Sequence, residues 1–323
     1  MRKIYLINTG EIEKGKTKVD YNQDDRVSLS PYLKEMIEKE KRTLDSNITP
    51  GQMYNIRTIQ KKDDTLFLKA GFTDYIEHVA HARIGLEKSN LINPEFNAFC
   101  AESVNRTSDG LLIALRREKN LPHGPGIYTA AGGYGVHFRG RKDNFGKFTP
   151  LNRGDPYDIA SFYVGRELEI PEDSFKLSWL GLAKCYELSF DLSVNFTTNL
   201  SQSSDKIMRV RRKDKILEGR IIDDMINFIE DSPDSILNFL SLINKDKREL
   251  PKDSLGIKYG ENPLTGKFGI NDDFIATIVQ HIERNHNKLY SSAVEILNEK
   301  GYEVINLSLA EGKKLDLQKE VTP

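Results

Sequence analysis

The stretch DPYDIASFYVGREL, residues 155–168, decides how the fold of this chain is interpreted. Asp155 is a good N-cap, and Pro156 suits the first helical position because its missing N–H costs no hydrogen bond there. Pro171 cannot continue a helix, since it has no backbone N–H to donate. The stretch therefore predicts one helix over residues 155–170 that ends by Pro171.

Strands are predicted on both sides of this helix. Before it, residues 96–106 and the apolar run LLIAL at 111–115 flank Asp109-Gly110, which is a turn signal typical of a β-hairpin. The stretch IYTAA at 127–131 then predicts a strand that ends in Gly132-Gly133. After the helix, residues rich in Leu, Tyr, Phe and Val predict two more strands, at about 177–188 and 190–197.

The outer parts of the chain show weaker patterns. Residues 2–8 predict a strand and residues 10–29 a loop, and Ser30 caps a short helix that begins at Pro31. Residues 54–69 predict two strands joined by a polar turn, and residues 74–87 predict a helix. Residues 271–300 predict a long amphipathic helix, and residues 310–323 a loose tail.

The order of these elements, with the sequences NRTSDGLLIALRR, PGIYTAAGG and an Asp-Pro-led helix ending in REL, resembles the Nudix hydrolases. It is most similar to their large variant, in which an N-terminal αβ region precedes the core. LFLKAGFTDYIEHVAHARI, residues 66–84, resembles the region before the core of that variant. The resemblance implies an α+β fold: a Nudix-type mixed β-sheet between helices, with an N-terminal αβ extension at 1–92, a core with C-terminal helices at 93–308 and a flexible tail at 309–323.

The Nudix box is only partly present. The family pattern G-x5-E-x7-R-E-U-x-E-E-x-G-U, with U aliphatic, is matched by Gly132 or Gly133 and by Arg166-Glu167-Leu168. Ile170 and Pro171 stand where the paired glutamates belong. In the family, three carboxylates on one helical face share magnesium ions that bridge the phosphates and activate water. Here the resemblance leaves Glu167 as the one box carboxylate on that face.

Candidate site residues follow from this resemblance. Glu167 is the candidate Mg²⁺ ligand and, with Glu169, a candidate catalytic residue, although Glu169 lies about 200° around the helix from it. Glu172 or Asp173 could replace the lost carboxylates if the helix end shifts. The candidate substrate-binding residues are those suited to phosphate or to close backbone approach: Arg116, Arg117, Gly132, Gly133, Arg139 and Arg166.

Each of these candidates also has a purely structural interpretation. Glu167 can be a buried carboxylate paired with an arginine, and the arginines can be surface charges. For Arg166 the resemblance implies that it braces the loop before the helix, with Asp158 as a candidate partner, and the alternative is a solvated arginine at the helix end. Other chemistry-bearing residues are interpreted as core or surface residues, because their spacing matches no recognised site: His78 and His81, His281 and His286, Cys100 and Cys185, and the basic stretch 206–215.

Composition limits the class of protein. The chain has 323 residues and a formal net charge of −1, which argues against a general nucleic-acid coat. Two cysteines cannot form a disulfide framework, so a reducing compartment is the simpler interpretation. The absence of a long apolar run argues against a membrane span, and a cytoplasmic location is expected.

One function is the leading hypothesis, and a second is its alternative. The first is a Nudix-like protein that binds a nucleotide or a nucleoside-diphosphate-linked metabolite, with weak or absent diphosphatase activity. The second is an active Mg²⁺-dependent hydrolase that cleaves a phosphoanhydride in such a compound. A third hypothesis is an interaction protein that uses only the scaffold.

Overall fold

The computed structural model describes most of the chain, in several segments. These are residues 2–43, 52–87, 93–116, 127–134, 141–142, 148–149, 154–185, 191–214, 225–243 and 270–321. The candidates Arg117 and Arg139 lie outside the described residues, and of Arg116 only the backbone is described.

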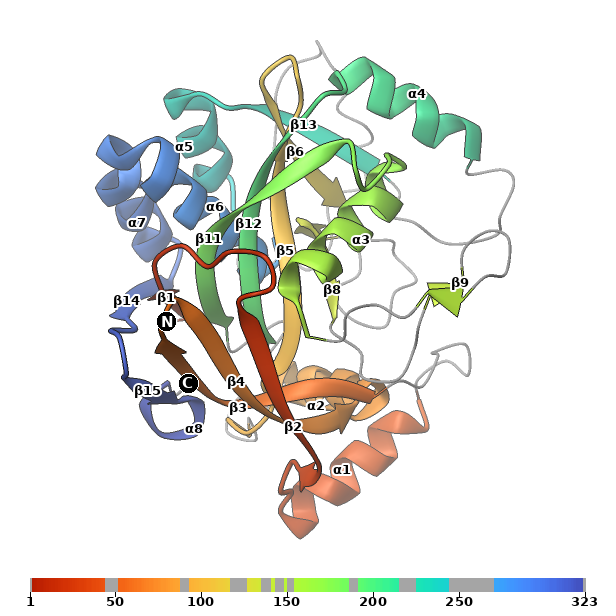
Figure 1. Cartoon of the computed structure of the whole chain (residues 1–323), viewed down its shortest axis with the longest axis vertical. Helices are drawn as coiled ribbons and strands as arrows, with labels where there is room; N and C mark the ends of the chain where they lie inside the picture. The colour runs from red at the N-terminus through yellow and green to blue at the C-terminus, as the bar shows by residue number, and fades with distance from the viewer. Residues whose placement is uncertain are drawn as a thin grey trace.

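The principal strands and helices alternate irregularly along the chain (Figure 1). The strands that build the main sheet are β1 (Arg2–Asn8), β2 (Thr17–Arg26), β3 (Gln52–Lys62), β4 (Thr65–Asp74), β5 (Ala98–Arg106), β6 (Leu111–Arg116), β7 (Tyr128–Thr129), β8 (Ala131–Tyr134), β11 (Phe175–Cys185), β12 (Asp191–Leu200), β13 (Met225–Glu230), β14 (Tyr302–Ser308) and β15 (Lys314–Asp316). The helices are α1 (Pro31–Lys41), α2 (Tyr75–Glu87), α3 (Pro156–Leu168), α4 (Ser204–Asp214), α5 (Pro233–Ser241), α6 (Asp272–Asn285), α7 (Tyr290–Glu299) and α8 (Leu317–Glu320).

One mixed sheet of 13 strands runs through the molecule. Its main path is β14-β1-β11-β12-β5-β3-β4-β2, and β6, β7, β8, β13 and β15 pair beside this path. β1 is antiparallel to β11 and parallel to β14, while β5 is parallel to β12 and antiparallel to β6 and β8. The α+β class with a mixed sheet between helices is thereby confirmed.

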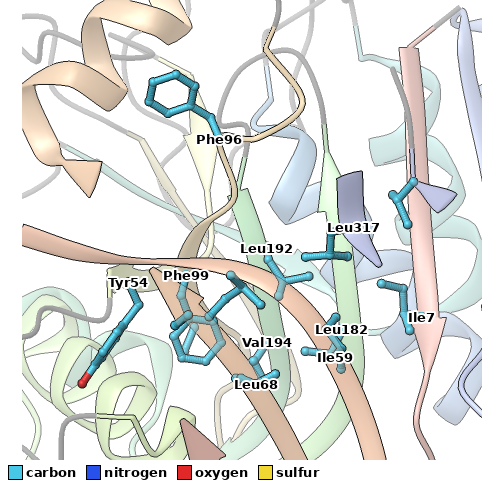
Figure 2. Close-up of a cluster of buried hydrophobic side chains, with 14 of the residues drawn as sticks. Ile7, Tyr54, Ile59, Leu68, Phe96, Phe99, Leu182, Leu192, Val194 and Leu317 are labelled. Carbon is cyan, nitrogen blue, oxygen red and sulfur yellow. The ribbon is translucent and has the colours of Figure 1, made fainter. Parts of the chain in front are cut away.

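The two faces of the central strands bury different cores, as alternation along β1 shows. Ile4 and Leu6 belong to a cluster that also contains residues of α5, α6 and α7, whereas Tyr5 and Ile7 belong to the cluster on the opposite face. That opposite cluster also holds apolar residues of α3 and of β3 and β4 (Figure 2). Figure 2 shows Ile59 and Leu68 of the N-terminal strands beside Leu182 and Val194 of β11 and β12. The extension therefore shares its core with the central sheet.

The predicted loop at residues 10–29 is wrong in part. Residues Thr17–Arg26 form β2, which pairs in parallel with β4 at one edge of the sheet. An edge strand pairs on one side only and commonly carries charged residues, so the sequence TKVDYNQDDR is polar and has only Val19 and Tyr21 as apolar residues. The hairpin of β3 and β4, and the helices α1 and α2, confirm the other N-terminal predictions.

The long helix predicted at 271–300 is also wrong in its continuity. α6 ends at Asn285, a short 3-10 turn covers Asn287–Leu289, and α7 follows. The interruption lies at His286, whose φ of −137° and ψ of 46° are not helical. The apolar stripe itself is confirmed, because Phe274, Ile278 and Ile282 are at most 2% exposed.

The C-terminal segment differs from the predicted loose tail. β15 pairs antiparallel with β3, and α8 follows it directly. Leu315, Leu317 and Val321 are buried in the same cluster as β3 and β4. Among the described helices, none combines the length and the apolar character that crossing a membrane requires.

Candidate functional site

Helix α3 forms where its capping residues predict. Asp155 accepts hydrogen bonds from the backbone N–H of Tyr157 at 2.9 Å and of Gly15 at 2.7 Å. Burial raises the pKa of Asp155, although these two donors act in the opposite direction. At the other end Glu169 adopts φ 55° and ψ 44°, a left-handed conformation that ends the helix. The prediction that this helix ends by Pro171 is confirmed.

Glu167 connects the helix to the glycines of the motif. Its side chain is buried, and its Oε2 accepts a hydrogen bond from the backbone N–H of Gly132 at 3.2 Å. Its Oε1 lies 3.9 Å from the guanidinium of Arg166. Two residues that lie 35 positions apart in this sequence, because its loop is longer than that of the motif, thus meet in space. The hydrogen bond also means that Oε2 of this carboxylate already accepts from a backbone N–H of the protein.

Gly132 and Gly133 lie on β8, directly opposite β5. Neither has a positive φ, so conformational freedom does not explain them. A Cβ on Gly132 would lie 2.6 Å from Cγ of Glu102 and 2.7 Å from the carbonyl oxygen of Ala101. A Cβ on Gly133 would lie 2.2 Å from the ring of Tyr163. Both glycines are therefore required by close approach of β8 to β5 and to α3.

Substituting Gly133 by alanine tests this packing. We expect Gly133→Ala to lower the free energy of unfolding by about 1–3 kcal/mol, because the added methyl group must displace the Tyr163 ring from a filled position. Chemical denaturation measures the change. In a Tyr163→Ala background the same substitution should cost much less, since the ring is gone. An equal loss in both backgrounds would contradict the proposed contact.

Arg166 does not pair with Asp158, the partner suggested for it from the sequence; the loop that it would brace, residues 135–153, lies mostly outside the described residues. Asp158 forms its ion pair with Lys14 at 2.6 Å, and the hydrogen bond between them raises the pKa of Lys14. The guanidinium of Arg166 instead lies over the ring of Tyr163, 4.9 Å from its centroid. Its side chain is 49% exposed. It is thereby held at the surface beside Glu167, where it can contact an anion.

The structure adds one acidic residue that the sequence analysis did not single out. Glu102 lies on β5 directly opposite Gly132, and it is 6% exposed. Glu102 and Glu167 therefore both border Gly132, one from the sheet and one from the helix. A single carboxylate within the otherwise apolar strand AFCAESV is the signal that could have identified it.

The remaining acidic candidates lie around the end of α3. Glu169 occupies the left-handed position just after the helix and is half-buried. Glu172 folds back over the helix end, since its Cγ lies 2.9 Å from the Cβ position of Gly165. Asp173 is exposed. Among the described residues, two groups of three metal-ligating side chains converge, and neither contains Glu167.

The histidines of α2 and the two cysteines are core residues, as the sequence analysis expects. His81 stacks on Phe96, and its burial, together with nearby His78 and Lys184, lowers its pKa well below the usual value. His78 contacts Asp191 at 3.1 Å. Cys100 and Cys185 are free thiols, and burial raises the pKa of each.

Comparisons with known proteins place few constraints on this site. No protein-family model matches the chain, and no curated protein matches it significantly. The similar solved structures include DR0079 from Deinococcus radiodurans, which is 15% identical over 44% of this chain and 72% of that chain, with a TM-score of 0.26. They also include the Nudix hydrolase RenU from M. smegmatis, which is 10% identical over 36% of this chain and 86% of that chain, with a TM-score of 0.20. TM-scores this low carry no argument about family or function.

Proposed function

We propose that this chain is a Nudix-like protein that binds a nucleotide or a nucleoside-diphosphate-linked metabolite and has weak or absent diphosphatase activity. The observation that carries the proposal is the hydrogen bond from the N–H of Gly132 to Glu167. It joins the two parts of the partial motif in one site: the glycines of β8 and the Arg-Glu-Leu sequence at the end of α3.

The exposed side of this site suits a phosphate group. Arg166 presents its guanidinium beside Glu167, and an arginine forms paired, charge-assisted hydrogen bonds with phosphate oxygens. Arg116, Arg117 and Arg139 remain proposed phosphate contacts on the sequence argument alone. The compound's base, sugar or second group would be recognised by other parts of the chain.

Weak catalysis follows from the carboxylates. Mg²⁺ prefers near-octahedral oxygen coordination and is commonly held by one or two carboxylates with substrate phosphates and water. Glu167 already accepts a backbone hydrogen bond and lies near Arg166, which leaves fewer lone pairs for a metal ion. Ile170 and Pro171 replace the paired glutamates of the motif. The helix end therefore offers one box carboxylate where the motif has three.

An active Mg²⁺-dependent hydrolase is the second candidate. It would hold an ion that bridges the phosphates with Glu167 and with carboxylates from the helix end, because Glu102, although it borders Gly132, lies on the sheet face opposite α3. Glu169, or Glu172 from beyond the helix end, would then be a candidate to orient the attacking water.

Thermal unfolding and hydrolysis assays distinguish these functions. The protein is heated with a panel of nucleoside mono-, di- and triphosphates and nucleoside diphosphate sugars, with and without Mg²⁺. A binder should show a rise in melting temperature with at least one compound class, because a ligand specific for the folded state stabilises it. Release of phosphate or nucleoside monophosphate with Mg²⁺ or Mn²⁺ would favour the hydrolase, and no response to any compound would favour the scaffold hypothesis.

A further inference from the structure

Two histidines and an aspartate converge at the C-terminal end of α6, away from the motif residues. From the sequence alone His281 and His286 are expected to be core or surface residues, because a spacing of five residues matches no recognised metal motif. The fold brings them together. Since α6 ends at Asn285, His286 leaves the helix and turns back toward His281. Asp231, in the link between β13 and α5, approaches both imidazoles.

The distances between the three side chains fit a shared ion. Oδ1 of Asp231 lies 3.2 Å from Nε2 of His281 and 2.8 Å from Nε2 of His286, and all three ligand atoms lie within 4.8 Å of one another. Donor atoms bound at about 2.1 Å to one metal ion, at angles of about 90–109°, lie about 3.0–3.4 Å apart. The site needs only small shifts to enclose an ion.

Neighbouring groups hold the ligands in place. Nδ1 of His281 lies 3.2 Å from Oγ1 of Thr197 on β12 and 3.1 Å from Nδ2 of Asn285, and these contacts fix the orientation of the imidazole ring. Nε of Arg106 lies 2.8 Å from Oδ2 of Asp231, the oxygen that does not face the histidines. The backbone N–H of Asp231 donates to the carbonyl of Gly110 in the β5–β6 turn.

The charge and the solvent accessibility of this cluster also suit a bound cation. The C-terminal end of a helix carries partial negative charge and favours a cation. His281 is 3% exposed and His286 is 20% exposed, which leaves the site open to solvent on the His286 side.

We propose that Asp231, His281 and His286 bind a divalent transition-metal ion such as Zn²⁺, with at least one coordination position open to solvent. Two imidazoles and one carboxylate are a ligand set that suits Zn²⁺ and Fe²⁺ better than Mg²⁺, which prefers oxygen ligands. The assignment does not depend on the proposed nucleotide function, because it involves none of the motif residues.

Metal titration of matched variants tests the proposal. Metal-free protein is titrated with Zn²⁺ by calorimetry and with Co²⁺ by visible absorption. We expect the native protein to bind one equivalent more than His286→Gln or Asp231→Asn, and to show Co²⁺ d–d absorption that both variants lack. Glu283→Gln, which removes an exposed carboxylate from the same helix, should behave like the native protein.

A variant that gains an absorption band distinguishes loss of a metal ligand from loss of folding. His286→Cys keeps a ligand at this position and should add a thiolate-to-Co²⁺ charge-transfer absorption, since Cys also binds these metals. Cooperative melting of each metal-free variant shows that it is folded. Equal Zn²⁺ stoichiometry and equal Co²⁺ spectra in the native protein and in folded His286→Gln would overturn the proposal, as would a His286→Cys protein without the thiolate band.

Discussion

Removing residues 269–323 should leave a chain that is insoluble or fails to melt cooperatively. The deleted part contains α6, whose residues Phe274, Ile275, Ile278 and Val279 are at most 2% exposed against the central sheet. It also contains β14, which pairs with β1, and β15, which pairs with β3. Without it, the apolar face of β1 and β11 would lie open to water. Solubility and thermal unfolding of residues 1–268 measure the effect.

A point substitution tests the same packing in a chain of full length. Phe274→Ala should lower the free energy of unfolding by about 3–5 kcal/mol, the range observed when a buried aromatic ring is removed from a core. Glu295→Gln on α7, at an exposed position, is the matched control and should change little. If residues 1–268 stay soluble and melt cooperatively at the temperature of the full chain, the C-terminal elements are a separate module.

Because of Lys184, we expect the free energy of unfolding to rise with pH between about 8 and 10.5. Its side chain is fully buried on β11, where Nζ donates to the carbonyl of Phe96 at 3.0 Å. Burial lowers its pKa from 10.5 to about 8, although nearby Asp191 and Asp273 act in the opposite direction. Between these two values the unfolded chain binds more protons than the folded one, so the free energy of unfolding increases with pH. Below pH 8 both states are protonated and this contribution is constant.

The comparison with Lys184→Met isolates this contribution. The difference between 10.5 and about 8 corresponds to about 3 kcal/mol of unfolding free energy. The native protein should gain that amount relative to the variant between pH 8 and 10.5, while the titrations of distant groups, which both proteins share, cancel. Urea unfolding at each pH gives the difference. A difference that stays flat over this range would show that Lys184 titrates normally in the folded chain.

The capping and turn residues predicted local structure well, because they act within a few positions of the chain. Asp155, Pro156 and Pro171 located α3, and Asp109-Gly110 located the β5–β6 hairpin. The edge strand β2 was missed because Val19 and Tyr21, its only apolar residues, are too few to mark an alternating pattern. The break after α6 was missed because the apolar stripe continues through it at nearly helical spacing.

Contacts between distant segments explain what the sequence could not predict at the sites. The approach of Glu102 to Gly132 depends on the pairing of β5 with β8. The meeting of Asp231 with the two histidines depends on three separate elements, and a motif with fixed spacing cannot express it. Asp158 was expected to pair with Arg166, but Lys14, more than a hundred residues earlier in the chain, takes that position.

The central claim is that a nucleotide binds at Gly132 and Glu167, with one box carboxylate available to a metal ion. Glu167→Gln tests it, because glutamine can still accept the hydrogen bond from Gly132 and so preserve the fold. A nucleotide that raises the melting temperature is titrated into both proteins with and without Mg²⁺. We predict equal affinity without metal, and an Mg²⁺ enhancement of affinity that is smaller in Glu167→Gln. Equal Mg²⁺ enhancement in the two proteins would contradict the role of Glu167 as a ligand, and strong hydrolysis by the native protein that Glu167→Gln abolishes would contradict the claim of weak catalysis.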